Sequence, residues 1–389
     1  MNDLAFHAGA GRTLRRVETA PLQSLPASWN HGWDDLAAHA SVPNSFSERW
    51  FVEASVRNLE PPPGARMHSV WRGEEMIGLM PIAAAGRYGR LHVRHMQNWR
   101  HHHCFLGTPL VRAGAEEDFW ETLLGGLDSD PSMPGFLHVT ALVAGGPVLG
   151  ALQSVRRAPV VHRLTRAMLS SDLSPGDYYR AHTRKKKRQE LERRLRRLAD
   201  LGSVAHRRLG DGDDVEAWCA EFLALEASGW KGRAGSALGA DPGTAAFFRD
   251  AVRGARDAGK LHFLRIDLDE RPIAMLIAFL SPPGSLSFKI AFDETYAAFS
   301  PGVQIQVDNL QILGRGDVEW MDSCSSGDCA MINSLWAERR DIVRVTVPLA
   351  GARRKTMFYL CRTAERAAET FRRTRAGPRS APDMPGIGQ

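Results

Sequence analysis

The two halves of this chain repeat one order of elements, and this repeat limits the folds that the chain can adopt. Hydrophobic periodicity and turn residues predict a strand, two helices, three meandering strands, a helix, a strand, a helix and a strand in each half. The order runs over residues 12–170 and again over residues 204–371. A repeat of half the chain length indicates a duplicated domain. We therefore expect an α/β (α+β) protein with two like domains, each a mixed, mostly antiparallel sheet flanked by helices.

A basic segment separates the two halves. Within residues 171–203, positions 184–188 are five consecutive basic residues, and four more arginines lie between positions 193 and 197. Leucines recur there at helical spacing, so we expect a linker helix with a narrow apolar stripe and a basic surface. Residues 372–389 are rich in Arg, Gly, Pro and Ser, which predicts a disordered tail.

Composition restricts the partners and the compartment. The 389 residues carry a formal net charge of +6, which favours acidic partners such as phosphates, nucleic acid or an anionic membrane surface. Five cysteines in so long a chain do not suit a disulfide framework, and no signal-peptide pattern is present. The longest apolar run, residues 272–280, is too short to span a bilayer. We expect a cytoplasmic protein, either free or peripheral at the inner membrane.

One stretch has the pattern of a cofactor-binding corner. From Leu286 to Phe292 apolar and polar residues alternate, which predicts a strand. Ser300-Pro301-Gly302 predicts a turn and a helix start, because serine caps helices and proline suits their first turn. The helical pattern begins at Val303, and a second strand then ends at Asp322.

This order of elements resembles the acyl-CoA N-acyltransferase (GNAT) fold, and the local sequence looks like its two-domain branch of FemAB and CelD-like proteins, which includes BioF2-like acetyltransferases. The resemblance covers about residues 40–360. The matching motifs are Phe105-Leu-Gly-Thr-Pro-Leu110, Glu226-Ala-Ser-Gly-Trp-Lys-Gly-Arg-Ala-Gly235, Lys289-Ile-Ala-Phe-Asp-Glu-Thr-Tyr296, Ser300-Pro301-Gly302 and Asp322. The resemblance implies two tandem GNAT-like domains and transfer of an acyl group from acyl-CoA, as a cosubstrate, to an amine.

The turn before the expected cofactor helix departs from the family pattern. A typical GNAT domain has Arg/Gln-x-x-Gly-x-Gly/Ala there, whose amides hold the CoA pyrophosphate, whereas this chain has Phe299-Ser300-Pro301-Gly302. Fewer glycines leave fewer free amides for phosphate. The resemblance still assigns cofactor binding to Ser300, Gly302, Val303 and Asp322, although Asp322 could instead cap the helix that follows.

N-acyl transfer requires a neutral amine, a base and donors for the tetrahedral oxyanion. Glu226 and Asp293 are the candidate bases, and Lys289 could hold an oxyanion, a phosphate or Asp293 itself. The substrate-binding residues implied by the resemblance are Trp230, Lys231 and Tyr296. The structural alternatives are an exposed strand pair for Lys289 and Asp293, and a core Trp230 with a solvated Glu226 beside it.

Three consecutive histidines, His101 to His103, suggest a metal site at first sight. They cannot all face one ion from a strand, and no second ligand cluster accompanies them, so we expect no bound metal. His102 or His103 could instead act as a catalytic base contributed across the domain cleft. A loop histidine without a role is the simpler alternative.

The basic helix Arg184–Arg197 has three interpretations. It could be a solvated helix between domains. Nucleic-acid binding is disfavoured, because the helix lacks interleaved aromatic residues and any known motif. A surface for CoA phosphates or an anionic membrane suits the family better, since each basic residue near such a membrane contributes about 1 kcal/mol.

We therefore expect an acyl-CoA-dependent N-acyltransferase that acts on a primary amine. The favoured acceptor is a long-chain amino-lipid, as in bacterial ceramide synthesis within sphingolipid metabolism, because the basic helix, the ten tryptophans and the net positive charge suit a membrane face. The first alternative is a CelD-like acetyltransferase of envelope polysaccharide or cellulose synthesis. The others are a FemAB-like aminoacyltransferase that uses aminoacyl-tRNA and a non-catalytic scaffold of polymer synthesis.

Overall fold

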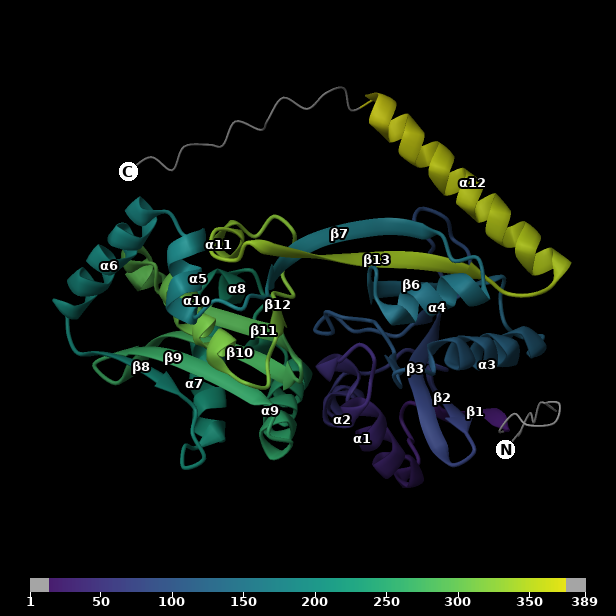
Figure 1. Ribbon diagram of the computed structural model, residues 1–389, viewed down its shortest axis with the longest axis horizontal. Coiled ribbons are helices and arrows are strands. Elements are labelled where there is room, and N and C mark those ends of the chain that lie inside the picture. The colour runs from purple at the N-terminus through teal and green to yellow at the C-terminus, as the bar shows by residue number, and fades with distance from the viewer. Residues whose placement is uncertain (1–13, 376–389) are drawn as a thin grey trace.

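The computed structural model describes residues 14–375 (Figure 1), with side chains described as far as residue 367. Residues 12 and 13 of the expected first domain lie outside the described residues, as do residues 376–389 of the expected tail. Residues 372–375, also assigned to that tail, instead continue a helix that ends at Arg375. Among the helices that the structure describes, none is both long and apolar enough to cross a membrane.

The predicted repeat of element order is confirmed. The first half contains β1 (Arg15–Pro21), α1 (Asn30–Ala38), α2 (Arg49–Asn58), β2 (Arg66–Arg72), β3 (Glu75–Ala85), β4 (His95–Asn98), β5 (Leu110–Val111), α3 (Glu116–Ser129), β6 (Phe136–Val143), α4 (Pro147–Val155) and β7 (Val160–Leu169). The second half contains β8 (Val204–Arg208), α7 (Val215–Ser228), α8 (Trp230–Arg233), α9 (Pro242–Asp257), β9 (Leu261–Leu268), β10 (Arg271–Ser281), β11 (Gly284–Phe292), α10 (Pro301–Asp308), β12 (Trp320–Asp322), α11 (Ala330–Asn333) and β13 (Glu338–Pro348). Helices α5 (Pro175–His182) and α6 (Lys185–Ala199) connect the halves, and α12 (Ala352–Arg375) follows the second.

The two halves share one 13-stranded sheet. Its main path runs β1-β2-β3-β4-β6-β13-β7-β12-β11-β10-β9-β8, and β5 pairs with β3 off this path. Strand β7, from the first half, pairs with β12 of the second, while β13, from the second half, pairs with β6 of the first. The two strands also pair with each other, and they form the long bridge between the halves in Figure 1. The sheet is therefore continuous across the linker that divides the sequence.

Aromatic side chains from both halves form a common core beside this bridge. Phe51 of α2 lies edge-on to Phe247 of α9 with ring centroids 5.4 Å apart, and Phe46 approaches Phe279 of β10 at 6.4 Å. All four side chains are at least 97% buried. Burying aromatic surface is a main source of stability. This core holds the first half in a fixed position against β10 and β11.

A buried carboxylate reinforces the same interface. Glu48, which precedes α2, accepts hydrogen bonds from Lys260 Nζ at 2.6 Å and from Ser281 Oγ at 3.0 Å. Trp50 Nε1 donates a third, at 2.8 Å. A buried charge is tolerated when it is paired and hydrogen-bonded in this way. The second half therefore holds α2 and the chain around it.

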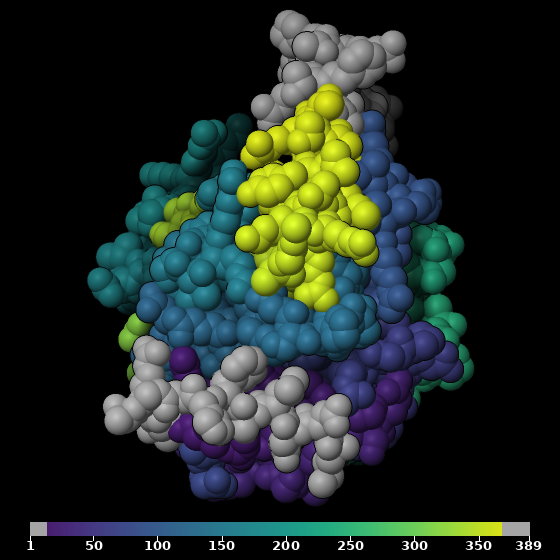
Figure 2. Space-filling view, turned by 90° about the vertical axis from the view of Figure 1, so that its right-hand side faces the viewer, coloured from purple at the N-terminus to yellow at the C-terminus, as the bar shows by residue number. Residues whose placement is uncertain are grey.

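Helix α12 returns the end of the chain to the first half. Phe358 is buried with Tyr88 and Phe136, and Arg354 donates hydrogen bonds to the carbonyl oxygens of Asp128 and Asp130. In the space-filling view, α12 is the yellow ridge on the blue surface of the first half (Figure 2).

Candidate active site

A cavity opens where β11 and β12 stop pairing. The two strands are parallel, and their register ends with Leu286 opposite Asp322. The residues that follow on both strands line a cavity of about 220 Å³. Its lining consists of Phe105, Lys231, Leu276, Ile277, Ser287, Phe288, Lys289, Ile290, Gln306, Ser323, Cys324, Ser325, Cys329, Met331 and Ile332. All of these residues except Phe105 come from the second half.

Two polar atoms of this lining have no partner within the described chain. They are Ser287 Oγ and Gln306 Oε1, and both atoms are buried. An unpaired buried polar group costs free energy, and nearly all such groups in native proteins have a partner. A bound molecule could pair with these two atoms only if the cavity wall shifted to expose them.

Lys289 is one of two lysines that line the cavity. Its Nζ lies 3.1 Å from His103 Nδ1, and 5.3 Å from the centroid of the Phe105 ring. Burial, followed by the nearby charge of Lys231, lowers the pKa of Lys289 to about 8, while the Glu226 carboxylate opposes that shift. Lysines with a pKa in this range suit both electrostatic and acid–base chemistry near neutral pH.

His103 is neutral and accepts the hydrogen bond from Lys289. Burial and the neighbouring Lys289 charge lower the pKa of His103 to about 3. A neutral ring has one acceptor nitrogen, so the contact with the ammonium puts the ring proton on Nε2. His102, in contrast, is exposed, and its ring lies edge-on to that of His103 at 5.4 Å. Of the two histidines predicted as a base across the cleft, His103 is the one that contacts the cavity residues.

Glu226 and Lys231 form an ion pair at the wall of the cavity. Lys231 Nζ lies 2.7 Å from Glu226 Oε1 and 3.3 Å from the carbonyl oxygen of Ile290. The other oxygen of Glu226 accepts from the Leu238 amide at 2.7 Å. Glu226 is only 4% exposed, whereas Trp230 is 56% exposed. The alternative of a core tryptophan beside a solvated glutamate is therefore wrong.

Asp293 and Tyr296 lie beyond the end of β11. The Asp293 carboxylate accepts from the Thr295 amide at 2.8 Å and so caps the short helical segment that follows. Tyr296 packs against the apolar cluster that includes Leu195 and Leu198 of α6. Neither residue is among those that line the cavity.

The turn before α10 brings the backbone of Gly302 close to the Phe292 side chain of β11. Ser300 has a φ of 56°, and its carbonyl oxygen accepts from the amides of Val303 and Gln304, each at 3.0 Å. A Cβ on Gly302 would lie 2.8 Å from Phe292 Cδ1, so glycine lets α10 approach β11. The Arg194 guanidinium of α6 donates to Ser300 Oγ. Arg194 therefore brings a positive charge to a turn in which the amides of Val303 and Gln304 are already used.

Replacing Gly302 with alanine should destabilise the protein by about 1–3 kcal/mol, because the added methyl group overpacks a buried contact. The free energy of unfolding in urea measures this effect. Gly316→Ala is the matched control, because a Cβ there meets no atom within 4 Å. Equal stability of the two variants would show that α10 does not depend on this approach.

Asp322 lies in a buried ion pair behind the cavity wall. Its oxygens lie 2.6 Å and 2.9 Å from Nε and Nη2 of Arg166, and 3.3 Å from Nη1 of Arg340. The Cys324 amide donates to it at 2.9 Å. Its side chain is fully buried. Since Arg166 belongs to β7 and Arg340 to β13, Asp322 binds the two bridging strands to β12.

Several residues of the cavity were not predicted from the sequence. They include Phe105, Ser287 and Gln306, of which Phe105 belongs to a motif that carried the family resemblance. Alternation along β11 could not have indicated Ser287, because adjacent residues of β10, Ile277 and Ala278, pair with Lys289 and Ser287, so a β-bulge interrupts the pattern there. Within residues 14–367, no group of three or more His, Cys, Asp and Glu side chains could hold a metal ion.

Comparisons with known proteins describe a related architecture. Residues 185–324 match a family of acetyltransferase (GNAT) domains. The structure of FemX is similar, with a TM-score of 0.55 and 10% identity over 88% of this chain and 99% of that chain. The C-terminal domain (DUF2156) of a protein from Agrobacterium fabrum, described as a lysylphosphatidylglycerol synthetase, has a TM-score of 0.50 and 12% identity over 87% of this chain and 96% of that one. No curated protein matches. At such low identities, the two structures establish the fold alone.

Proposed function

We propose that this acyltransferase, whose second half carries the GNAT domain, moves an acyl group from acyl-CoA to a primary amine in the cavity beside Lys289. The observation that carries the proposal is the half-buried Lys289 ammonium in the lining of this cavity, at the point where β11 and β12 separate. A charge placed in a cavity that excludes most water stabilises a developing oxyanion strongly.

The reaction needs one bond to form and one to break. The amine nitrogen attacks the thioester carbonyl carbon, and the carbonyl oxygen becomes an oxyanion to which Lys289 donates a hydrogen bond. The C–S bond then breaks, and the thiolate of CoA takes up a proton as the amine gives one up. Of the two proposed bases, Glu226 is better placed than Asp293, because its partner Lys231 lines the cavity.

We place the CoA phosphates between α10 and α6. Ser300, Gly302 and Val303 would provide the turn, and Arg194 already contacts Ser300. Exposed cations of the α6 segment extend the positive surface. They are Arg184, Lys185, Lys186, Arg193, Arg196 and Arg197. The same exposed cations are the proposed contact with an anionic membrane surface.

The proposed acceptor is a long-chain amino-lipid, in a reaction of the bacterial ceramide synthase type. Apolar side chains support it, because Leu276, Ile277, Met331 and Ile332 line the cavity and Trp230 is exposed beside it. Apolar walls with a few polar groups are typical of sites that bind apolar ligands.

Acyl transfer itself tests this proposal. The purified protein, incubated with palmitoyl-CoA and a sphingoid base, should release CoA thiol and form the N-acyl amide, detected by mass spectrometry. Amide formation only from acetyl-CoA and an amino sugar would favour the polysaccharide acetyltransferase, and product only from aminoacyl-tRNA would favour the FemAB-like enzyme. A folded protein that forms no amide from any of these donors would overturn the proposed function.

The acyl-CoA chain length that stabilises the protein most should be long. A ligand that binds only the folded state raises the free energy of unfolding, by about 2.7 kcal/mol at a hundred times its Kd. We expect palmitoyl-CoA to raise the melting temperature more than acetyl-CoA does, and free CoA serves as the control. An equal shift with all three would place the binding free energy in the CoA moiety and contradict an acyl-chain site.

A further inference from the structure

The first half has a counterpart of the cavity, and its own chain fills it. Strands β4 and β6 are parallel, with Met96 opposite Leu137, as β11 and β12 are in the second half. Residues 99–109 follow β4 and fold back against β6. There the Gly107 amide donates to the Ala141 carbonyl at 2.8 Å.

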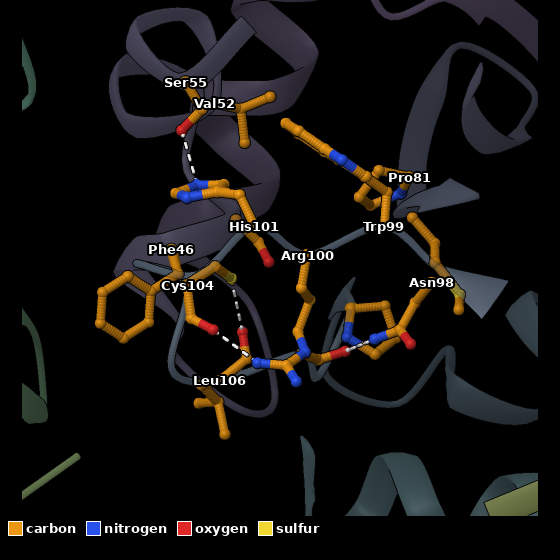
Figure 3. Close-up of a pocket in the computed structure, with 14 residues that line it drawn as sticks. Phe46, Val52, Ser55, Pro81, Asn98, Trp99, Arg100, His101, Cys104 and Leu106 are labelled. Atoms are coloured by element: carbon orange, nitrogen blue, oxygen red, sulfur yellow. Dashed lines mark hydrogen bonds between the residues drawn. The ribbon is translucent and has the colours of Figure 1, made fainter. Parts of the chain in front are cut away.

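The fit of this segment is tight. Asn98 Nδ2 donates to the carbonyl oxygens of Gly107 and Thr140, each at 3.0 Å. A Cβ on Gly107 would lie 2.2 Å from the Thr140 oxygen, so the segment requires glycine there. The space left in this region is about 20 Å³, lined by residues such as Asn98, His101 and Cys104 (Figure 3). That volume holds one or two water molecules, since each needs about 10–15 Å³.

The same segment reaches across to the second half. His103 accepts from Lys289 Nζ at 3.1 Å, and its ring is stacked on Phe247 of α9 at 5.7 Å. The Phe105 ring lies below the same ammonium, and its carbonyl oxygen accepts from Arg166 at 3.0 Å. Segment 99–109 therefore fills one cavity and lines the other.

Hydrogen bonds fix the position of His103 on the side away from the cavity. Its amide donates to His101 Nδ1 at 3.3 Å, so the neutral His101 ring carries its proton on Nε2. His101 Nε2 donates that proton to Ser55 Oγ, and the two atoms lie 3.0 Å apart (Figure 3). Ser55 Oγ in turn donates to the Phe51 carbonyl oxygen at 2.7 Å. Each donor in this series of hydrogen bonds has one acceptor, and the series anchors segment 99–109 to α2.

We infer that His103 is a positioning residue, which holds the Lys289 ammonium toward the thioester in the second half. Segment 99–109 fills the corresponding cavity of the first half, so that half binds no substrate there. The inference rests on the proposed function. It gives the first half a specific part in the reaction, because a donor aimed at the reacting oxygen acts only if it is held in place. The other ionisable groups that face Lys289 and His103 are Lys231, Glu226, His101 and His102.

His103→Ala tests the inference. We expect kcat to fall by about 10-fold to 100-fold with little change in KM, because misplacing a catalytic group costs rate more than binding. His103→Asn keeps an acceptor near the position of Nδ1 and should recover most of the rate. His92→Ala removes an exposed histidine outside the cavity lining and should behave as the unaltered protein does.

A second measurement does not depend on activity. Nuclear magnetic resonance of lysine-labelled protein follows the titration of Lys289, and His103→Ala should move its pKa from about 8 toward the ordinary 10.5, because the cavity opens to water. An unchanged titration and an unchanged kcat in His103→Ala would overturn the inference and leave the proposed function intact. If no acyl transfer is found at all, a shifted titration still supports the contact, and an unshifted one refutes it.

Discussion

Replacing Lys289 with methionine should abolish most acyl transfer while leaving the protein folded. Methionine retains an apolar stem of similar length and removes the half-buried ammonium, which is the charge proposed to meet the oxyanion. Loss of one oxyanion donor typically lowers kcat about 10²- to 10³-fold. Steady-state rates with palmitoyl-CoA measure this effect, and urea unfolding checks the fold.

A lysine outside the cavity provides the control for that experiment. Lys355 is exposed on α12, and Lys355→Met should retain full activity. If Lys289→Met keeps the rate of the unaltered protein, Lys289 does not contact the reacting atoms. That result would favour the alternative that Lys289 is a strand lysine without a role in the reaction.

The pH dependence of kcat distinguishes two roles for Lys289. Its pKa of about 8 means that the ammonium predominates below pH 8 and the neutral amine above it. An oxyanion donor must be charged, so we expect kcat to fall as pH rises through about 8, whereas a general base would make kcat rise there. Lys289→Arg keeps its charge to much higher pH and should remove the fall. A rising profile in the unaltered protein would contradict the donor role.

Local rules were sufficient for the elements that carry the candidate site. Alternation from Leu286 to Phe292 predicted β11, and the periodic leucines predicted α6, where Leu191 and Leu198 are buried. At the start of α7, Asp214 accepts from the amides of Glu216 and Ala217, as an aspartate before a helical pattern is expected to do. These features depend on a few neighbouring residues, so sequence pattern identifies them.

Features set by distant contacts were not predictable in this way. The residues of Val160–Leu169 predict a strand but not its partners, so the crossing of β7 and β13 between the halves left no local signal. Helix α7 is apolar over most of its surface, which hid the burial of Glu226. The three histidines lie in a loop without periodicity, so no pattern could tell His103 from His102.

Asp322→Ala should cause the largest loss of stability among these variants. Arg166 is 3% exposed and would remain buried with its charge uncompensated, as would much of the charge of Arg340. Removing one partner of a buried ion pair costs about 3–5 kcal/mol. The free energy of unfolding in urea, followed by circular dichroism, measures this loss.

An exposed ion pair in the same region is the control for the effect of burial on the loss of unfolding free energy. Asp317 and Arg315 lie 2.7 Å apart near the protein surface, and Asp317→Ala should cost less than about 1 kcal/mol. The two aspartates also separate the structural role of Asp322 from its predicted contact with the cosubstrate. A stable Asp322→Ala variant that no longer responds to acyl-CoA would favour the cosubstrate role. A destabilised variant that still binds acyl-CoA would mean that Asp322 acts through β7, β12 and β13, and that the strands exchanged between the halves hold the cavity in shape.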